Sequence, residues 1–278
     1  MATSQTSAPI GRRAHAAWLL FGGVLTGVVL AGCALGSWVV LNGHDKRMAE
    51  TQQQSYQHQA NRIELDVESG DVILAAGPAG QVSVERRLEW SGPKPVVEES
   101  WQGDTLHIRA QCPRAGLTQL GMTRCSTAYA LRVPDGVVVE ASVRSGAIRA
   151  NDLKGELRLS NLFGNIEIAN ASGRIQVRSD IGSIMATGLS CTEADVKTQQ
   201  GDVNLHFAAP PELLKTGAVT GNVEVAVPPP GKDTDGYQIR ADARHGDRHI
   251  GVPEDPAARH QLFATTDDGD VYVRYTGA

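Results

Sequence analysis

The most regular feature of the chain is a short alternation of apolar and polar residues that follows a glycine. Gly146, Gly155, Gly164, Gly173 and Gly182 are spaced by nine residues and open the segments GAIRA, GELRL, GNIEI, GRIQV and GSIMA. Alternation with a period of two is typical of a half-buried β-strand, and glycine tolerates the positive φ that many tight turns require. The pattern therefore predicts short strands joined by glycine turns.

The same pattern recurs on both sides of this run. It returns as GDVIL at Gly70, GDVNL at Gly201, GNVEV at Gly221 and GDVYV at Gly269. One short strand cannot bury its apolar face alone, but stacked copies form a continuous core. We therefore expect an all-β repeat domain with turns at these four glycines and at the five above.

Two architectures fit these repeats: a β-solenoid with two strands per coil, or an antiparallel β-sandwich. Glycines at positions 146, 164, 182, 201 and 221 recur every 18 to 20 residues, the length of a coil made of two repeats. In that register Arg149 and Glu167 are neighbours on the outer face, where opposite charges contribute up to about 1 kcal/mol. The spacing favours the solenoid, with an internal ladder of apolar residues at Ile148, Ile166, Ile184, Val203 and Val223.

The section before Gly146 also predicts strands, although its turns are irregular. They are expected at Ile63–Val67, Val82–Trp90, Val96–Trp101, Thr105–Ala110, Tyr129–Val133 and Val137–Val143. The end of a stack of parallel strands needs protection from edge-to-edge pairing. We therefore expect residues 63–143 to form an irregular β cap and residues 144–278 to form the β-helix-like solenoid.

An uncharged apolar segment near the N-terminus, residues 16–41, predicts one transmembrane helix. About 20 apolar residues span a bilayer as a helix, and Trp18 and Trp38 lie near its two ends, where interfacial tryptophans are common. A cytoplasmic tail of residues 1–15 is expected before it and a polar linker of residues 42–62 after it. The chain is thus predicted to be a single-pass protein of the cell membrane, with its N-terminus cytoplasmic and its β domain extracytoplasmic.

Two alternatives to a membrane-spanning helix exist for this segment. A cleaved signal peptide has an apolar core of about 7–15 residues, which is shorter than this run. The tetrapeptide LAGC, ending at Cys33, resembles a lipobox and would make Cys33 the site of lipid attachment, but the apolar run continues to Leu41. Small-xxx-small patterns in the segment raise the further hypothesis of a homo-oligomer formed through the membrane helix.

The cysteines point to an oxidising compartment. Cys112 and Cys125 bracket a short loop between strand-like segments, which predicts a loop-closing disulfide worth about 3 kcal/mol in the chain-entropy model. Free thiols and half of a zinc site are the alternatives, but no further ligands follow at metal-like spacing. Cys191 is expected to be buried as a small apolar residue.

The composition and motifs exclude several classes of function. The net charge is −5, and no basic cluster indicates nucleic-acid binding. The sequence has no phosphate-binding loop, dinucleotide fingerprint, nucleophile elbow or HExxH motif. We therefore expect no catalytic residue, no cofactor, no metal and no enzymatic activity.

The acidic and histidine residues near the turns are the remaining chemical candidates. Asp71, Asp202 and Asp270 could be aligned carboxylates for glycan cleavage or calcium binding, but aspartate is also favoured at turns because its side chain accepts bonds from backbone N–H groups. Their scatter along the sequence favours the turn role. His245 and His249 have a metal-like separation without an evident third ligand, so a polar turn is favoured there too.

The sequence resembles the bacterial putative-adhesin family, uncharacterised membrane-anchored proteins with Gly-Asp-Val-type β repeats. The resemblance extends from Ile63 to the C-terminus, although several repeats have GAI, GEL, GRI or GSI in place of GDV. It implies a β-repeat fold and brings no catalytic residue. Besides the apolar N-terminal segment, it rests on SGDV at Ser69–Val72, WQGDTL at Trp101–Leu106, the Cys112 and Cys125 pair before YALRVPDGV, QGDV at Gln200–Val203 and DGDV at Asp268–Val271.

Three functions follow from these features, in order of preference. The first is a non-enzymatic, adhesin-like binding or scaffold module, whose partners are the lipid bilayer and an unknown cell-envelope glycan or protein. The second is an envelope-stress or signalling partner of another membrane protein, which the membrane helix would contact. The third is a glycan-active enzyme built on a β-helix.

Overall fold

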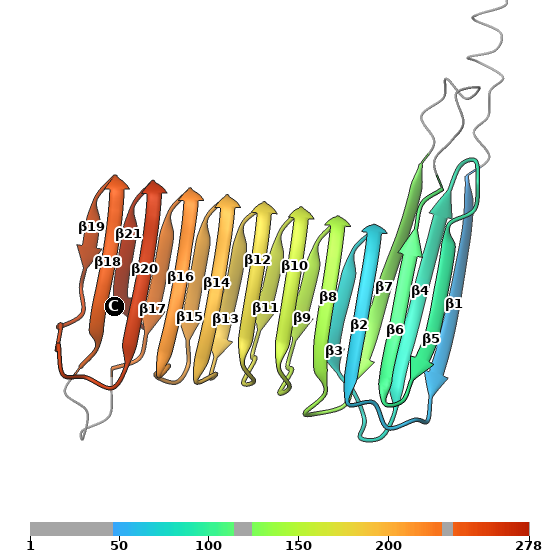
Figure 1. Ribbon diagram of the computed structural model, residues 1–278, viewed down its shortest axis with the longest axis horizontal. Helices are drawn as coiled ribbons and strands as arrows, with labels where there is room; N and C mark the ends of the chain where they lie inside the picture. The colour runs from blue at the N-terminus through green and yellow to red at the C-terminus, as the bar shows by residue number, and fades with distance from the viewer. Residues whose placement is uncertain (1–46, 114–123, 230–235, 278) are drawn as a thin grey trace, which may run out of the picture. The chain divides into compact units, whose positions relative to one another are not determined.

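The computed structural model describes residues 47–113, 124–229 and 236–277, which form two facing β-sheets (Figure 1). Sheet A has the order β1-β4-β7-β3-β9-β11-β13-β15-β17-β21-β19, and sheet B has the order β18-β20-β16-β14-β12-β10-β8-β2-β6-β5. The strands are β1 (Met48–Tyr56), β2 (Arg62–Ser69), β3 (Val72–Ala76), β4 (Val82–Trp90), β5 (Val96–Gln102), β6 (Thr105–Gln111), β7 (Cys125–Val133), β8 (Val138–Ser145), β9 (Ile148–Asn151), β10 (Leu157–Phe163), β11 (Ile166–Ala169), β12 (Ile175–Ile181), β13 (Ile184–Leu189), β14 (Glu193–Gln200), β15 (Val203–Phe207), β16 (Leu213–Thr220), β17 (Val223–Val227), β18 (Gln238–His245), β19 (Arg248–Ile250), β20 (Gln261–Asp268) and β21 (Val271–Tyr275).

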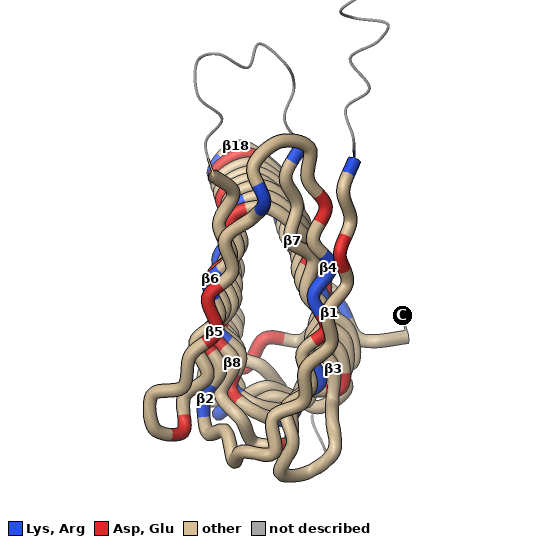
Figure 2. The backbone as a smooth tube through the Cα atoms, turned by 90° about the vertical axis from the view of Figure 1, so that its right-hand side faces the viewer, with Lys and Arg blue, Asp and Glu red and all other residues tan. Residues whose placement is uncertain are grey.

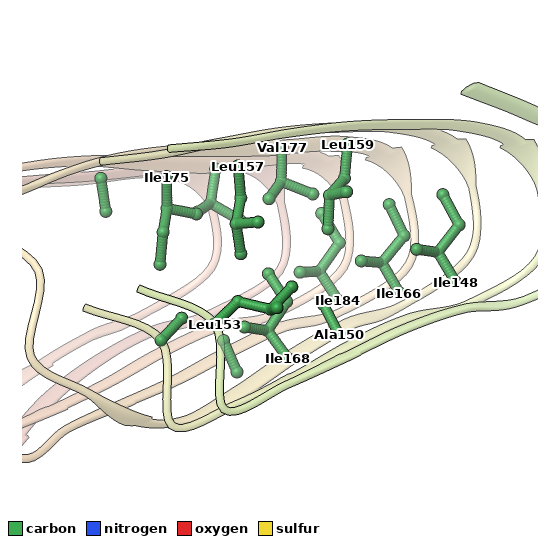
Figure 3. Close-up of a cluster of buried hydrophobic side chains, with 14 of the residues drawn as sticks. Ile148, Ala150, Leu153, Leu157, Leu159, Ile166, Ile168, Ile175, Val177 and Ile184 are labelled. Atoms are coloured by element: carbon green, nitrogen blue, oxygen red, sulfur yellow. The ribbon is translucent and has the colours of Figure 1, made fainter. Parts of the chain in front are cut away.

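Each coil contributes one strand to sheet B and the next strand to sheet A, and neighbouring coils pair in parallel. The predicted internal ladder is confirmed, because Ile148 pairs with Ile166, Ile166 with Ile184, and the series continues through Val203 to Val223. Figure 3 shows the first three isoleucines in a row, with residues of sheet B opposite them. Viewed from the N-terminal end, the two sheets face each other across this core (Figure 2). The all-β solenoid is therefore confirmed, and the alternative of an antiparallel sandwich is wrong.

The order of the coils in space departs from their order in the chain at both ends. Coil β2–β3 lies between β6–β7 and β8–β9, and coil β20–β21 lies between β16–β17 and β18–β19. Residues 63–143 are therefore not a separate cap, because β2 and β3 continue the parallel stack and the predicted boundary at residue 144 falls inside β8. The prediction failed because these coils pair with partners far away in the sequence, which a spacing of 18 to 20 residues cannot reveal.

The N-terminal end is finished by antiparallel strands. β4 pairs antiparallel with β7, β1 with β4, and β5 with β6. The linker expected at residues 42–62 is thus partly wrong, since Met48–Tyr56 forms the edge strand β1. Its polar sequence has no apolar alternation because an edge strand at the end of the stack leaves most of its side chains exposed.

The turns from sheet B to sheet A form one edge of the stack, which we call the glycine rim (upper edge in Figure 1). Gly70, Gly146, Gly164, Gly182, Gly201, Gly221 and Gly269 lie there with positive φ. A Cβ on Gly182 would also lie 1.8 Å from the carbonyl oxygen of Gly164, so close stacking requires glycine as much as the backbone angle does. Gly155 and Gly173 differ from the expectation: they lie at the opposite rim without positive φ, and only close backbone approach excludes a side chain there.

The predicted cytoplasmic tail, transmembrane helix and small-xxx-small patterns, together with Cys33, lie outside the described residues. Within the described ranges, the structure contains no helix that is long and apolar enough to cross a membrane.

Candidate functional site

A groove of about 760 Å³ lies on the outer face of sheet B. Its central row consists of Asp66, Ser142, Ser160 and Arg178, which occupy the same register on β2, β8, β10 and β12. Adjacent strands lie about 4.8 Å apart, so the two serines separate the Cα atoms of Asp66 and Arg178 by roughly 14 Å. Two short hydroxyl side chains thus form a floor between groups of opposite charge.

A second row borders this floor toward the glycine rim. It contains Glu68, Arg144, Leu162 and Asp180, each two residues before a rim glycine. The Glu68 carboxylate accepts a hydrogen bond from the backbone N–H of Cys112 at 2.8 Å, and Asp180 accepts one from the side chain of Gln199 at 3.1 Å. Arg144 is exposed and forms no ion pair with another residue in the described part of the chain. Its guanidinium is therefore available to a ligand.

The charged residues of the central row already have partners. Arg178 contacts Asp195 at 2.6 Å and donates to the carbonyl oxygens of Val177 and Asp195, while Asp66 lies 3.5 Å from Arg109. These contacts hold the two side chains at the ends of the serine floor. Such an arrangement can hydrogen-bond an extended polar ligand, with the exposed guanidinium of Arg144 at its border.

The disulfide lies at one end of the groove. Cys112 and Cys125 are bonded, with their Cα atoms 5.8 Å apart, which confirms the predicted pairing. The bridge joins the end of β6 to the start of β7, where other coils have a glycine turn. Cys191 is free and buried, as expected, and burial raises the pKa of its thiol to about 11.

The three turn aspartates serve the backbone of the adjacent coil. The carboxylate of Asp71 accepts the N–H of Ala147 at 2.9 Å, that of Asp202 accepts the N–H of Asn222 at 2.8 Å, and that of Asp270 accepts the N–H of Asp247 at 2.8 Å. The last bond, together with that from the Tyr272 hydroxyl, lowers the pKa of Asp270. The turn role is correct, but the amide that each aspartate accepts belongs to the neighbouring coil.

The histidine candidates are not brought together as ligands. His245 lies 3.0 Å from Asp268, whereas the His249 ring stacks on Tyr272 with the ring centroids 4.7 Å apart. Over the described ranges, no group of three or more His, Cys, Asp or Glu side chains is arranged to hold a metal ion. Arg244 and Asp267, beside them, form another exposed pair at 3.4 Å.

The groove residues were missed in the sequence although a signal for them exists. Asp66, Ser142, Ser160 and Arg178 each precede a rim glycine by four residues, and the bordering row precedes it by two. Aligning the repeats on the glycines and reading backward would have placed both rows on the outer face. Reading forward from the rim glycines covers only strands of sheet A.

The stacked coils, with strands out of chain order at both ends, define a two-sheet β-solenoid. The chain belongs to the Toastrack family, DUF4097, whose model matches residues 60–277. This membership supports the resemblance to the putative-adhesin family. No curated protein matches the chain.

Solved structures with similarity to the chain have low sequence identity. A putative adhesin from Bacteroides fragilis is 10% identical, with 82% of this chain and 97% of that chain covered and a TM-score of 0.48. A putative cell adhesion protein from Clostridium sporogenes is 9% identical, with 82% and 100% covered and a TM-score of 0.39. A putative lipid binding protein from Parabacteroides distasonis is 12% identical, with 82% and 96% covered and a TM-score of 0.30. Similarities of this size do not establish a shared function.

Proposed function

We propose that this protein is a membrane-anchored, extracytoplasmic module that binds a polar component of the cell envelope without chemical turnover. The observation that carries the proposal is the groove on sheet B, where serine hydroxyls form a floor between held charges and the Arg144 side chain is exposed at the border. Its rows repeat at the spacing of the strands, which suits a ligand that is itself extended, such as an envelope glycan bearing acidic groups. The predicted transmembrane helix, residues 16–41, would hold the domain at the cell membrane.

The absence of turnover in this proposal is supported by the state of the carboxylates. Enzymes that cleave glycosidic bonds use a pair of carboxyl groups across the scissile bond. Here Asp71, Asp202 and Asp270 each bond a backbone amide of the next coil. The carboxylates of Asp66 and Asp180 lie at different ends of the groove and contact Arg109 and Gln199.

The test is co-sedimentation of the oxidised β domain with isolated cell walls. We expect saturable binding that Arg144→Ala weakens at least tenfold, because a hydrogen-bonded charge contact is worth about 1.5–3 kcal/mol. Ser160→Trp should abolish binding by filling the floor. Arg132→Ala is the matched control, since Arg132 is an exposed arginine on β7 of the other sheet. Absence of saturable binding, or equal losses in Arg144→Ala and Arg132→Ala, would contradict the proposal.

A further inference from the structure

The exposed large apolar side chains are not spread evenly over the β domain. Among the described residues they are Met48, Ile73, Val96, Phe163, Ile181, Met185 and Val219, with exposed fractions between 39% and 53%. Apolar side chains scattered singly on a surface are ordinary, but a set confined to one edge indicates an interaction site.

Five of the seven lie at the glycine rim, and Ile73 and Met185 lie on the outer face of sheet A, a few residues from it. Phe163 and Ile181 are paired neighbours that directly precede rim glycines, and Val219 lies two residues before Gly221. Ile73 and Met185 follow rim glycines by three residues, or about 10 Å of strand. The other two start strands at the same edge, because β1 begins opposite Trp90 and β5 begins opposite Gln111, beside the disulfide.

The opposite rim has a different character. Its surface carries polar contacts such as Lys154 with Asp135 at 2.6 Å and Asn170 with Asp152 at 2.9 Å. On the glycine rim, the turns around Phe163 and Ile181 have the sequences LFGN and DIGS. Asp180 is the single charged residue of these two turns. The centre of the glycine rim is thus apolar and nearly uncharged, and the opposite rim is polar.

The chain enters the domain at the same edge. β1 begins at Met48 at the glycine rim (Figure 1), and the predicted apolar span ends at Leu41. Only six residues, 42–47, separate the two. A fully extended chain covers at most about 3.3–3.6 Å per residue, so this connection reaches roughly 20 Å. With residues 16–41 in the bilayer, as proposed above, a connection this short would keep the edge of the domain that contains Met48 within reach of the lipid surface.

We infer that the glycine rim around Phe163, Ile181 and Val219 rests on the outer surface of the lipid bilayer, with these side chains in the interfacial layer. The inference rests on the proposed anchoring by residues 16–41. Because the rim turns near these residues carry little charge, and those of the C-terminal coils carry Asp267, Asp268 and Asp270, the contact depends on apolar insertion and needs no anionic lipid. The groove on sheet B would then open sideways, parallel to the membrane.

The experiment uses the full chain with Cys33→Ser, reconstituted in phosphatidylcholine vesicles containing a doxyl-labelled lipid. A fluorescent probe is attached to Gln200→Cys, next to Ile181 on the rim, or to Ser172→Cys on the opposite rim. Cys191 is buried and the other two cysteines form the disulfide, so they do not react. We expect the lipid to quench the Gln200→Cys probe at least threefold more than the Ser172→Cys probe.

Substitutions then separate apolar insertion from simple proximity. Phe163→Ser with Ile181→Ser should reduce quenching of the rim probe at least twofold, whereas Arg174→Ser on the opposite rim should leave it unchanged. Vesicles with added phosphatidylglycerol should give no stronger quenching. Equal quenching of the two probes in a chain that floats with the vesicles would overturn the rim contact and leave the proposed binding function intact. A chain that no longer floats would contradict the anchoring helix and overturn the inference with it, while the cell-wall assay still reports on the groove.

Discussion

The central coils and the two ends of the solenoid solve different physical problems. From β8 to β17 each strand pairs in parallel with the strand one coil away in chain order, and most inward positions are aliphatic, with a few buried polar residues such as Asn161, Ser179 and Thr198. At both ends a coil is placed out of order, and the last positions of the internal ladder carry polar or charged side chains. The repeat geometry alone would allow coils to be added without limit. Ending the stack therefore requires residues that the repeat does not contain.

The N-terminal end shows how termination works. The internal ladder continues from Ile148 through Val72 to Tyr129, and then to Arg86 and Gln52. Arg86 contacts Glu99 of β5 in the facing sheet at 2.5 Å, with 21% and 9% of the two side chains exposed. Glu99 also accepts a bond from the Tyr56 hydroxyl, whose pKa is raised by burial first and by Glu99 second.

The C-terminal end also places an arginine at the last position of the ladder, although this arginine is exposed. Arg248 occupies the ladder position next to Val271 and donates to the carbonyl oxygen of Ala241 on β18, at 3.0 Å. A side chain from sheet A thus reaches sheet B across each end of the core. The half-buried Arg86 and the exposed Arg248 both disfavour further stacking, because a new apolar coil would have to desolvate their charges.

The strongest way to break the regular centre is to add a methyl group to the glycine rim. Gly182→Ala places a Cβ 1.8 Å from the carbonyl oxygen of Gly164 at a φ of +151°. We expect the free energy of unfolding, measured with urea, to fall by roughly 3 kcal/mol or more, as for other substitutions that strain the backbone and overpack the interior.

Gly103→Ala is the matched control for this prediction. Gly103 also has positive φ, in the β5–β6 turn, but nothing lies within 4 Å of a Cβ added there. Gly103→Ala should lower the free energy of unfolding only through the unfavourable backbone angle, by about 1–2 kcal/mol. Equal losses for Gly182→Ala and Gly103→Ala would show that φ rather than stacking dictates glycine at the rim.

The next prediction breaks the N-terminal end and leaves the centre intact. Arg86→Met leaves the Glu99 carboxylate buried without its cation, which should cost about 3 kcal/mol. Hydrogen exchange should rise in β1, β5 and the N-terminal part of β7, while β10 to β15 stay protected.

A second substitution identifies the cause of that loss. Arg86→Met with Glu99→Met should recover most of the stability, since no unpaired charge remains. By contrast, Arg149→Met removes an exposed partner of Glu167, 3.2 Å away on the outer face, and should cost less than about 1 kcal/mol. A loss that persists in the double variant would assign the effect to packing of the arginine stem.

The contrast between centre and ends also explains what the sequence could predict. The register of Ile148, Ile166 and Ile184 follows from nine-residue spacing, because consecutive coils are adjacent in the chain. The insertion of β2–β3 beside β8–β9 depends on a pairing of Val72 with Ile148, which no local pattern encodes. The disulfide was predictable because its two cysteines bracket one turn.

The groove was less predictable than the fold for a related reason. Ser142 and Ser160 are ordinary strand residues in sequence, and they become a floor only when β8 and β10 are aligned. Asp66 at the end of that row comes from the out-of-order coil. The site therefore combines a repeat position with a nonlocal pairing, and only the first of these can be read from the chain.

A smaller effect is expected from the side chains that follow the rim glycines. They form a series in which each accepts the N–H of the next coil, from Asn165 to Ser183 to Asp202 to Asn222 to Asp270. Asp202→Ala should cost about 1 kcal/mol, the net worth of one hydrogen bond, and Asp202→Asn should be close to neutral. A large loss in Asp202→Asn would show that the charge matters, and would reopen a chemical role for this carboxylate.

The smallest prediction sharpens the comparison by improving the centre. Ala147 is the one position in this rim series, within the described coils, without a side-chain acceptor, although its own N–H bonds Asp71. Ala147→Asn places an amide oxygen where Asn165 and Asn222 have theirs, so it should accept the N–H of Asn165 and raise the free energy of unfolding by roughly 0.5 kcal/mol. Ala147→Leu, which adds volume but no acceptor, should give no gain. If both variants were equally stable in urea, the hydrogen bonds between the turns would be a consequence of the stacked glycines. They would then add nothing to the stability of the domain. A gain in Ala147→Asn alone would show that the central coils are held by bonds between turns as well as by the apolar ladder, a contribution that the charged ends do not supply.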